Sequence, residues 1–170
     1  MKEMITQNKK ENRTVERIRG GIRETYICRV EDKKYIEEIL FELKNDLYNK
    51  KLSVEKLKEL AEKFADSAVF LVVQENKKES VIRYVAVYCN DKEYNRAFIS
   101  MIIVKKSWQS RGMGTMLLKA AIKAAKEMGM QKISLEVAKE NKVAVYFYRK
   151  HGFSQVKENE YSSFMEKEII

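Results

Sequence analysis

The stretch IIVKKSWQSRGMGTMLL, residues 102–118, joins an apolar run to an alanine-rich segment through a loop that carries two glycines. Before the loop, residues 98–104 are apolar and β-prone apart from Ser100, which is typical of a buried strand. After the loop, apolar residues recur at helical spacings over residues 115–128. The sequence therefore predicts a strand, a glycine loop and a helix in direct succession.

The two glycines, Gly112 and Gly114, fall where the helix is expected to begin. The first turn of a helix has unpaired backbone N–H groups, with the positive end of the helix dipole behind them. A phosphate can approach closely where no Cβ stands in its way, and Arg111, Lys105 and Lys106 add positive charge. The pattern predicts an anion site. The alternative is a glycine-rich helix start that holds no ligand.

Composition bounds the class of protein. At 170 residues, with 45 % hydrophobic and 35 % charged residues, the chain suits one globular α/β domain. No apolar run approaches the length of a membrane span, and no secretory signal is found near Met1. The two cysteines, Cys28 and Cys89, lie in strand patterns and offer neither a disulfide framework nor a metal-binding spacing. We expect a cytoplasmic protein with no metal site and no membrane partner.

Positive charge is concentrated near the amino terminus. The net charge is +9, and residues 1–23 supply +4 of it, with seven Lys or Arg against three Glu. Residues 1–21 are polar and end in two glycines, which predicts a basic flexible arm before a domain over residues 22–170. Elsewhere the basic residues alternate with Glu along the helices, as on solvated faces. We therefore expect no specific nucleic-acid binding.

Hydrophobic periodicity predicts the order β-α-α-β-β-β-α-β-α-β-β. Asp32 and Ser53 are expected N-caps of the first two helices, and Gly129 is the expected end of the third. A crossover helix joins parallel strands, so the sheet is mixed, mostly antiparallel, with about seven strands and four helices. Strands are expected at residues 22–30, 69–74, 81–88, 98–104, 132–137, 153–156 and 161–165, and apolar helical stripes at residues 36–47, 54–65, 117–128 and 143–148.

A second motif follows the strand predicted at residues 132–137. Residues 141–153, NKVAVYFYRKHGF, contain Asn141, then Ala144, an aromatic pair and the dipeptide Gly152-Phe153. This motif, the spacing Gln-x-x-Gly-x-Gly at residues 109–114 and the element order together resemble the GNAT superfamily of N-acetyltransferases. The resemblance covers residues 22–168. It implies a single-domain GNAT fold with acetyl-CoA as the cosubstrate.

In that family the coenzyme lies where the fourth and fifth strands splay apart. By resemblance, the pyrophosphate falls on Gln109, Ser110, Arg111, Gly112, Met113, Gly114 and Thr115, and the pantetheine and thioester carbonyl on the backbone of Ile102, Ile103 and Val104. Asn141 matches a residue near the pantetheine arm, and Tyr148 matches a catalytic tyrosine beside the sulfur. Parallel strands that separate leave N–H and C=O groups with which the two amides of pantetheine can pair.

Several of these residues have a structural alternative. Asn141 can be the N-cap of a helix, and Tyr148 lies on an apolar helical face that also suits a core residue. His151, the only histidine, precedes the glycine that stops the helix, and interaction with the helix dipole accounts for it without a catalytic role. Trp108 suits packing at the edge of the site better than stacking on adenine.

The general base is the missing part of the pattern. A lysine-like amine must lose a proton before it attacks, and family members often use a Glu early in the fourth strand. That place falls at Phe98 here, so Glu136 and Glu93 are the nearest carboxylates by topology.

The sequence therefore predicts N-acetyl transfer from acetyl-CoA to a primary amine of an unidentified small molecule or protein. A homodimer is a possible assembly of the chain. The alternative is a non-catalytic acyl-CoA-binding or protein-interaction module on the same fold.

Overall fold

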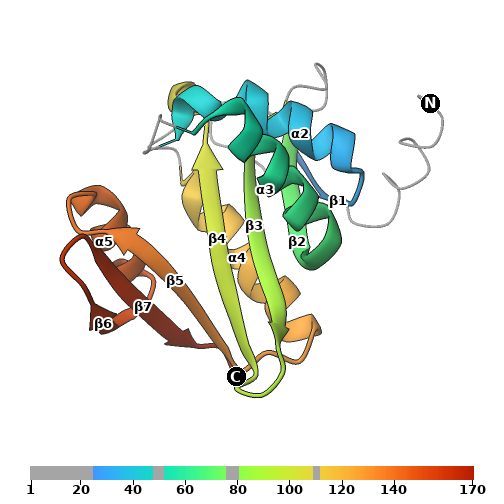
Figure 1. The fold of residues 1–170 in the computed structure, drawn as a ribbon. Coiled ribbons are helices and arrows are strands. Elements are labelled where there is room, and N and C mark those ends of the chain that lie inside the picture. Colours follow the sequence, from blue (N-terminus) through green and yellow to red (C-terminus); the bar gives the residue numbers. More distant parts are fainter. Residues whose placement is uncertain (1–24, 48–51, 76–80, 109–111) are drawn as a thin grey trace.

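The computed structural model describes residues 25–47, 52–75, 81–108 and 112–170 (Figure 1). The arm predicted over residues 1–21 lies outside these ranges. The described elements are β1 (Thr25–Val30), α2 (Lys33–Glu42), η1 (Lys44–Asp46), α3 (Val54–Ser67), β2 (Ala68–Glu75), β3 (Val81–Asp91), β4 (Arg96–Val104), η2 (Lys106–Trp108), α4 (Met113–Glu127), β5 (Lys132–Ala138), α5 (Lys142–Lys150), β6 (Ser154–Glu158) and β7 (Ser162–Glu168).

The seven described strands form one sheet in the order β1-β2-β3-β4-β5-β7-β6. Only β4 and β5 run parallel, because α4 crosses over between them, and the other neighbours are antiparallel. This confirms the predicted element order and the mixed, mostly antiparallel sheet. It also confirms the predicted α/β fold with its four α-helices in the described chain.

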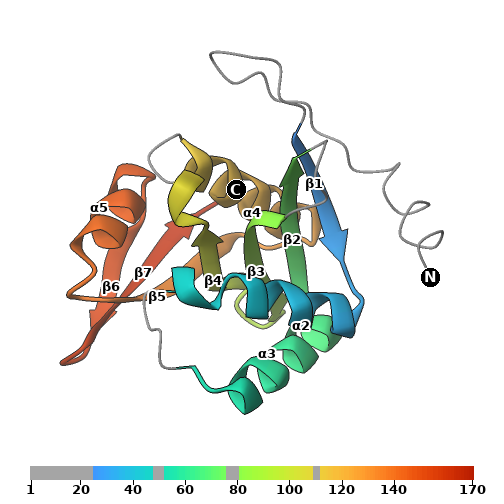
Figure 2. The ribbon, with the colours of Figure 1, turned by 90° about the horizontal axis from the view of Figure 1, so that it is seen from above.

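The helices cover both faces of the sheet, as Figure 2 shows from above. Helices α2 and α3 lie on one face, where Asp32 and Ser53 cap them by accepting hydrogen bonds from the N–H groups of Tyr35 and Lys56. Helices α4 and α5 pack on the other face. Each face has its own buried core, and Ala121 and Phe64 are fully buried examples from the two.

The helix that begins after Asp32 ends earlier than its apolar stripe predicts. Helix α2 stops at Glu42, and the chain continues as the short 3-10 helix η1. Leu43 and Leu47 are nevertheless buried, at 0 % and 6 % exposed. The residues of the apolar stripe are therefore buried as predicted, while the last turn is a 3-10 helix and not a continuation of the α-helix.

Strand β4 is less buried than its apolar sequence predicts. Ala97, Ile99 and Ile103 are buried, but Phe98 is 36 % exposed. The pairing with β3 also shifts between Ile99 and Met101, so Ser100 is an extra residue in β4. The expectation of a buried strand was wrong for Phe98, although it pairs with Ser134 of β5. Its neighbours Ala97 and Ile99 lie in the α4 core, so its side chain lies on the opposite face of the sheet.

Candidate active site

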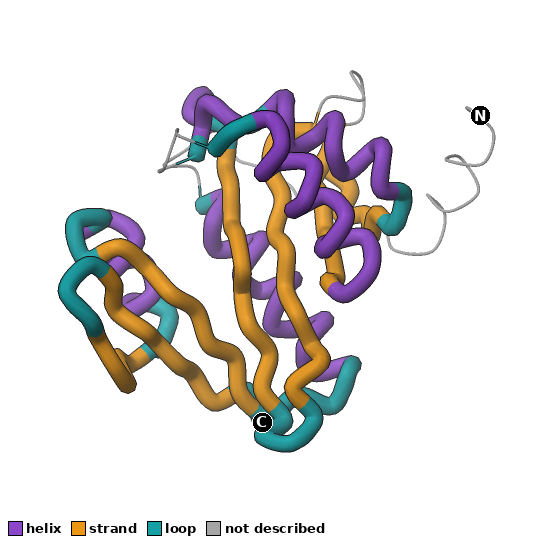
Figure 3. Tube along the Cα trace, viewed as in Figure 1, coloured by secondary structure: helices purple, strands orange, loops and turns teal. Residues whose placement is uncertain are grey.

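The parallel strands β4 and β5 are paired along only part of their length. Arg96–Ile99 of β4 pair with Lys132–Leu135 of β5, which we call the closed end. Beyond these four pairs the strands diverge, as the ribbon and the tube both show (Figures 1 and 3). We call residues 100–104 and 136–138 the open end. The extra residue Ser100 lies where the two ends meet.

The predicted pantetheine-binding backbone lies at this open end. Ile102, Ile103 and Val104 pair with Val85, Tyr84 and Arg83 of β3 and lie beyond the last pair of the β4–β5 ladder. In an antiparallel ladder every second residue directs its N–H and C=O away from the paired strand. Part of this backbone therefore faces β5 across the open end, where amide groups of a ligand can pair with it.

Gly112 is the N-cap of α4 and has a φ of 74°. Among the described residues no side chain caps the helix, and a Cβ built on Gly112 meets nothing within 4 Å. The positive φ favours glycine here, and Gly112 has no side chain of its own to cap the first-turn N–H groups. These features fit an anionic group at the start of α4. The residues predicted just before it, Gln109, Ser110 and Arg111, lie outside the described residues.

Gly114 has a packing role that the sequence does not indicate. A Cβ built on it meets the Phe147 ring of α5 at 3.3 Å, so this glycine gives room to a neighbouring helix, while its binding to a pyrophosphate stays a prediction. Met113 is 5 % exposed, which leaves only its backbone for binding. Lys105 was also expected to serve an anion. Its Nζ instead lies 3.3 Å from Glu42 of α2.

Asn141 is the N-cap of α5. Its Oδ1 accepts a hydrogen bond from the N–H of Ala144 at 3.2 Å, which confirms the capping alternative. One lone pair of the oxygen is engaged, and the side-chain NH2 group remains as a donor. Contact with a coenzyme remains a prediction, and a ligand carbonyl is the acceptor that suits this NH2 group.

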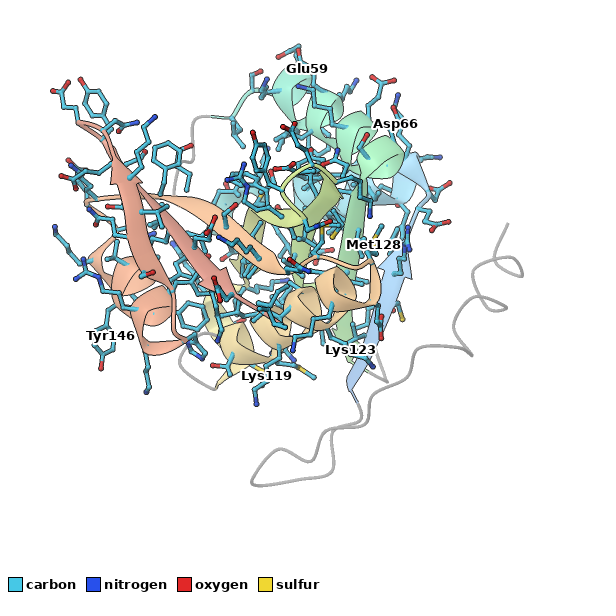
Figure 4. The ribbon with its side chains drawn as sticks, turned by 90° about the horizontal axis from the view of Figure 1, so that it is seen from below. Glu59, Asp66, Lys119, Lys123, Met128 and Tyr146 are labelled. Carbon is cyan, nitrogen blue, oxygen red and sulfur yellow. The ribbon has the colours of Figure 1, made fainter. Side chains whose placement is uncertain are left out.

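Tyr148 lies on the face of α5 that packs against the core of α4. Its ring centroid is 5.2 Å from that of Phe147 and 5.6 Å from that of Phe153, both edge-on. Burial raises the pKa of Tyr148 to about 12, so its hydroxyl holds a proton at neutral pH. Tyr146, by contrast, is 69 % exposed and points outward from α5 in Figure 4.

His151 joins α5 to α4. Its Nδ1 lies 2.8 Å from the carbonyl oxygen of Phe147, and its Nε2 lies 2.9 Å from Oγ1 of Thr115. Its own carbonyl accepts a hydrogen bond from Nζ of Lys167 on β7. His151 does follow the last residue of α5, as predicted. The helix dipole does not account for it alone, because its side chain reaches the first turn of α4.

Of the three carboxylates Glu93, Glu136 and Glu166, only Glu136 is at the open end. Glu93 is in the turn between β3 and β4, at the closed end, so it is remote from the open end. Glu166 pairs with Lys132 at 3.3 Å and with Arg96 at 3.8 Å. Glu136 is the first β5 residue beyond the pairing and is exposed. Its neighbours Leu135 and Val137 are in the α4 core, so strand alternation places Glu136 on the α2 face of the sheet.

Two features of the site were not predicted from the sequence. Arg83 of β3 is fully buried and donates a hydrogen bond to Sδ of Met116 at 3.2 Å, which places a cation beside the start of α4. Its only sequence signal is a charged residue within an apolar run. The pairing of Thr115 with His151 joins residues 36 positions apart and has no sequence signal.

The sequence model of the Acetyltransferase (GNAT) family matches residues 34–153 of the chain. The chain therefore belongs to the GNAT family. It is 35 % identical over 94 residues, 53 % of its length, to an uncharacterized N-acetyltransferase of Methanocaldococcus jannaschii. It is 37 % identical over 62 residues, 36 % of its length, to the N-alpha-acetyltransferase MAK3 of Arabidopsis thaliana. These matches cover 41 % and 33 % of the relatives' own lengths.

The fold is also that of a solved structure, the paiA N-acetyltransferase of Thermoplasma acidophilum in complex with coenzyme A. The two share 21 % identity and a TM-score of 0.65 over 85 % of this chain and 99 % of that one. In the described part of the chain, no helix is long and apolar enough to cross a membrane. The same residues contain no cluster of three or more side chains suited to a metal ion.

Proposed function

We propose that this protein transfers an acetyl group from acetyl-CoA to a primary amine. Family membership and the open end between β4 and β5 support the proposal. The observation that carries it is the end of the β4–β5 ladder at Ile99, beyond which α4 begins at Gly112 with a positive φ and α5 packs on the first turn of α4 through Phe147 and His151. Tyr148 lies beside Phe147 on α5. Acetyl-CoA has an anionic pyrophosphate, an arm with two amides and a thioester sulfur. The start of α4, the β4 backbone and Tyr148 are suited to these three parts in that order.

In the proposed site, the first turn of α4 holds the pyrophosphate at Gly112, Met113, Gly114 and Thr115, with Gln109, Ser110 and Arg111 beside them. The backbone of Ile102, Ile103 and Val104 pairs with the pantetheine amides. A backbone N–H of this run also stabilises the charge that develops on the thioester oxygen when the amine attacks. The side-chain NH2 of Asn141 donates to a carbonyl of the arm.

The chemistry is an acyl transfer in which a C–N bond forms and the C–S bond breaks. The amine loses one proton, to water or to Glu136, the exposed carboxylate at the start of the open end. Tyr148 supplies a hydrogen bond, and finally a proton, to the departing sulfur. Because its pKa is about 12 and a free thiol has about 8.5, full proton transfer is uphill by about 5 kcal/mol in the free protein. Hydrogen bonding to the sulfur is therefore its larger contribution.

The absence of a carboxylate at Phe98 favours an acceptor that needs little help to lose its proton. A lysine side chain is only about one part in 2,500 neutral at pH 7, whereas a peptide α-amine, with a pKa of about 7.7–8.0, is roughly a tenth neutral. A matched relative is named an N-alpha-acetyltransferase. We therefore propose a peptide α-amine as the first acceptor to test. We further propose a cytoplasmic location, no specific nucleic acid and no metal; a homodimer stays a prediction.

The experiment is a thiol-release assay with acetyl-CoA. The acceptors are short peptides with free α-amines, the same peptides blocked at the α-amine but carrying lysine, and small primary amines. We expect acceptor-dependent release of free thiol, fastest with the free α-amines. Binding of acetyl-CoA without release for any amine would favour the second candidate, a non-catalytic acyl-CoA-binding module, which the missing carboxylate at Phe98 supports.

A further inference from the structure

The structure assigns His151 as a positioning residue. We infer that it fixes the first turn of α4 against the end of α5, and so sets the distance between the two places where an acyl-CoA is held. The inference rests on the proposed function, because it concerns how the same site is held in shape. His151 itself is not placed in contact with the coenzyme.

The hydrogen bonds around His151 define its tautomer. The carbonyl oxygen of Phe147 can only accept, so Nδ1 at 2.8 Å carries the proton. In the neutral ring Nε2 then accepts from the hydroxyl of Thr115 at 2.9 Å. A protonated ring donates to the same hydroxyl oxygen, so the contact persists in either state. The ring also stacks on Phe147, with centroids 4.4 Å apart.

This contact matters because the two helices belong to different parts of the sheet. Helix α4 follows β4, while α5 lies between β5 and β6. In the β-ladder the two parts are joined by the four residue pairs of the closed end. At the open end, Phe147 of α5 packs over Gly114 of α4, and His151 is hydrogen-bonded to Thr115. The bond is the directional one of the two.

An acyl-CoA would be held at both helices at once. Its pyrophosphate is placed at the first turn of α4, which includes Thr115, and its sulfur beside Tyr148 of α5. His151 is three residues after Tyr148, so the two side chains share one side of the helix end. A pantetheine arm has a fixed reach. The relative placement of α4 and α5 therefore decides whether one ligand satisfies both places without strain.

The test compares two ligands by calorimetry at one pH. One is acetyl-CoA, and the other is 3′-phosphoadenosine 5′-diphosphate, which has the nucleotide and diphosphate but lacks the pantetheine arm. The variants are His151→Phe, which keeps a ring to stack on Phe147, Thr115→Val, which keeps the branched shape, and the double variant. Thr115→Ser retains the hydroxyl, and Lys150→Ala is a matched control at the same helix end.

We expect His151→Phe and Thr115→Val each to weaken acetyl-CoA binding about fivefold, the effect of losing one hydrogen bond. The double variant should lose no more than either single one, because both remove the same bond. Lys150→Ala should stay within twofold of the wild type, and Thr115→Ser should restore most of the affinity that Thr115→Val loses. The armless nucleotide should bind His151→Phe within twofold of the wild type, because it occupies only one of the two places.

Unchanged acetyl-CoA affinity in both single variants would overturn the inference. So would losses that multiply in the double variant, or an equal loss for the armless nucleotide, which would show that Thr115 acts only on the pyrophosphate. If His151→Phe fails to fold, the contrast between Thr115→Val and Thr115→Ser decides. A wild type that binds no acetyl-CoA would overturn the proposed function itself, which distinguishes that failure from this one.

Discussion

The closed and open ends of the β4–β5 seam are built in opposite ways. At the closed end the strands are paired, Ser134 Oγ donates to the carbonyl of Ala97 at 3.1 Å, and Glu166 bridges Arg96 and Lys132. At the open end the pairing of β4 with β5 stops, and the start of α4 contacts α5 through Gly114 with Phe147 and Thr115 with His151. The polar groups of the closed end bond within the protein, while we propose that those of the open end bind a ligand.

This difference predicts that substitutions at the two ends have separate effects. Changes at the open end should lower ligand affinity or turnover and leave the free energy of unfolding nearly unchanged. Changes at the closed end should do the reverse, because their partners lie within the protein. A closed-end variant that abolished binding would break the comparison.

The largest expected effect is at Gly112. Asp and Asn both tolerate a positive φ better than other side chains, so Gly112→Asp and Gly112→Asn form a pair that differs mainly in charge. We expect Gly112→Asp to weaken acetyl-CoA binding about 100-fold, because it places a carboxylate where the pyrophosphate is proposed to lie. Gly112→Asn should lose much less in the same calorimetric titration. Equal losses for both would point to backbone strain instead of charge.

Next is Tyr148→Phe, which keeps the ring packing against Phe147 and Phe153. We expect turnover to fall about tenfold, with little change in the Kd for acetyl-CoA and in Tm. The general range for a positioned proton donor is about 10² to 10⁴. The raised pKa of Tyr148, about 12, makes it a weak acid, and the expected loss is correspondingly small. Steady-state kinetics measure this effect. Unchanged turnover would show that Tyr148 packs in the core and has no catalytic role.

At the closed end, Ser134→Ala removes the hydrogen bond to the carbonyl of Ala97. We expect the free energy of unfolding to fall by about 1 kcal/mol, the usual net value of one such bond. Acetyl-CoA affinity should stay within twofold of the wild type. Urea denaturation and calorimetry measure the two quantities on the same preparation. A loss of affinity without a loss of stability would show that the closed end also serves the ligand.

The smallest expected effect is for Glu166→Gln, which ends the ion pairs with Arg96 and Lys132. Both basic side chains are 43 % exposed, so solvent screens the pairs and we expect a loss of about 0.5 kcal/mol. The difference from the wild type should vanish in about 1 M salt. A loss that persists there would assign Glu166 a packing role beyond its charge.

Most of the fold is predictable from the sequence because its signals are local. Apolar periodicity locates the helices and strands, and Asp32, Ser53, Asn141 and Gly129 mark helix ends through capping or a positive φ. Periodicity does not report what lies beside a strand. It therefore predicts a buried β4, whereas Phe98, on the sheet face opposite the α4 core, is 36 % exposed.

The site is less predictable because its geometry depends on contacts between distant segments. The glycine motif locates the start of α4, but only the structure shows that Gly114 makes room for Phe147. Likewise, the sequence explains His151 by the helix on which it lies, while its partner Thr115 belongs to another helix. The predicted residues 109–111 lie outside the described chain, and their binding role stays a prediction.

The central claim is that the open end binds an acetyl-CoA thioester, and one calorimetric titration of the wild-type protein tests it most directly. We predict a single site with a micromolar Kd. We also predict a rise in Tm, since a ligand at 100 times its Kd adds about 2.7 kcal/mol to the free energy of unfolding. No heat of binding and no rise in Tm at millimolar acetyl-CoA would contradict the account.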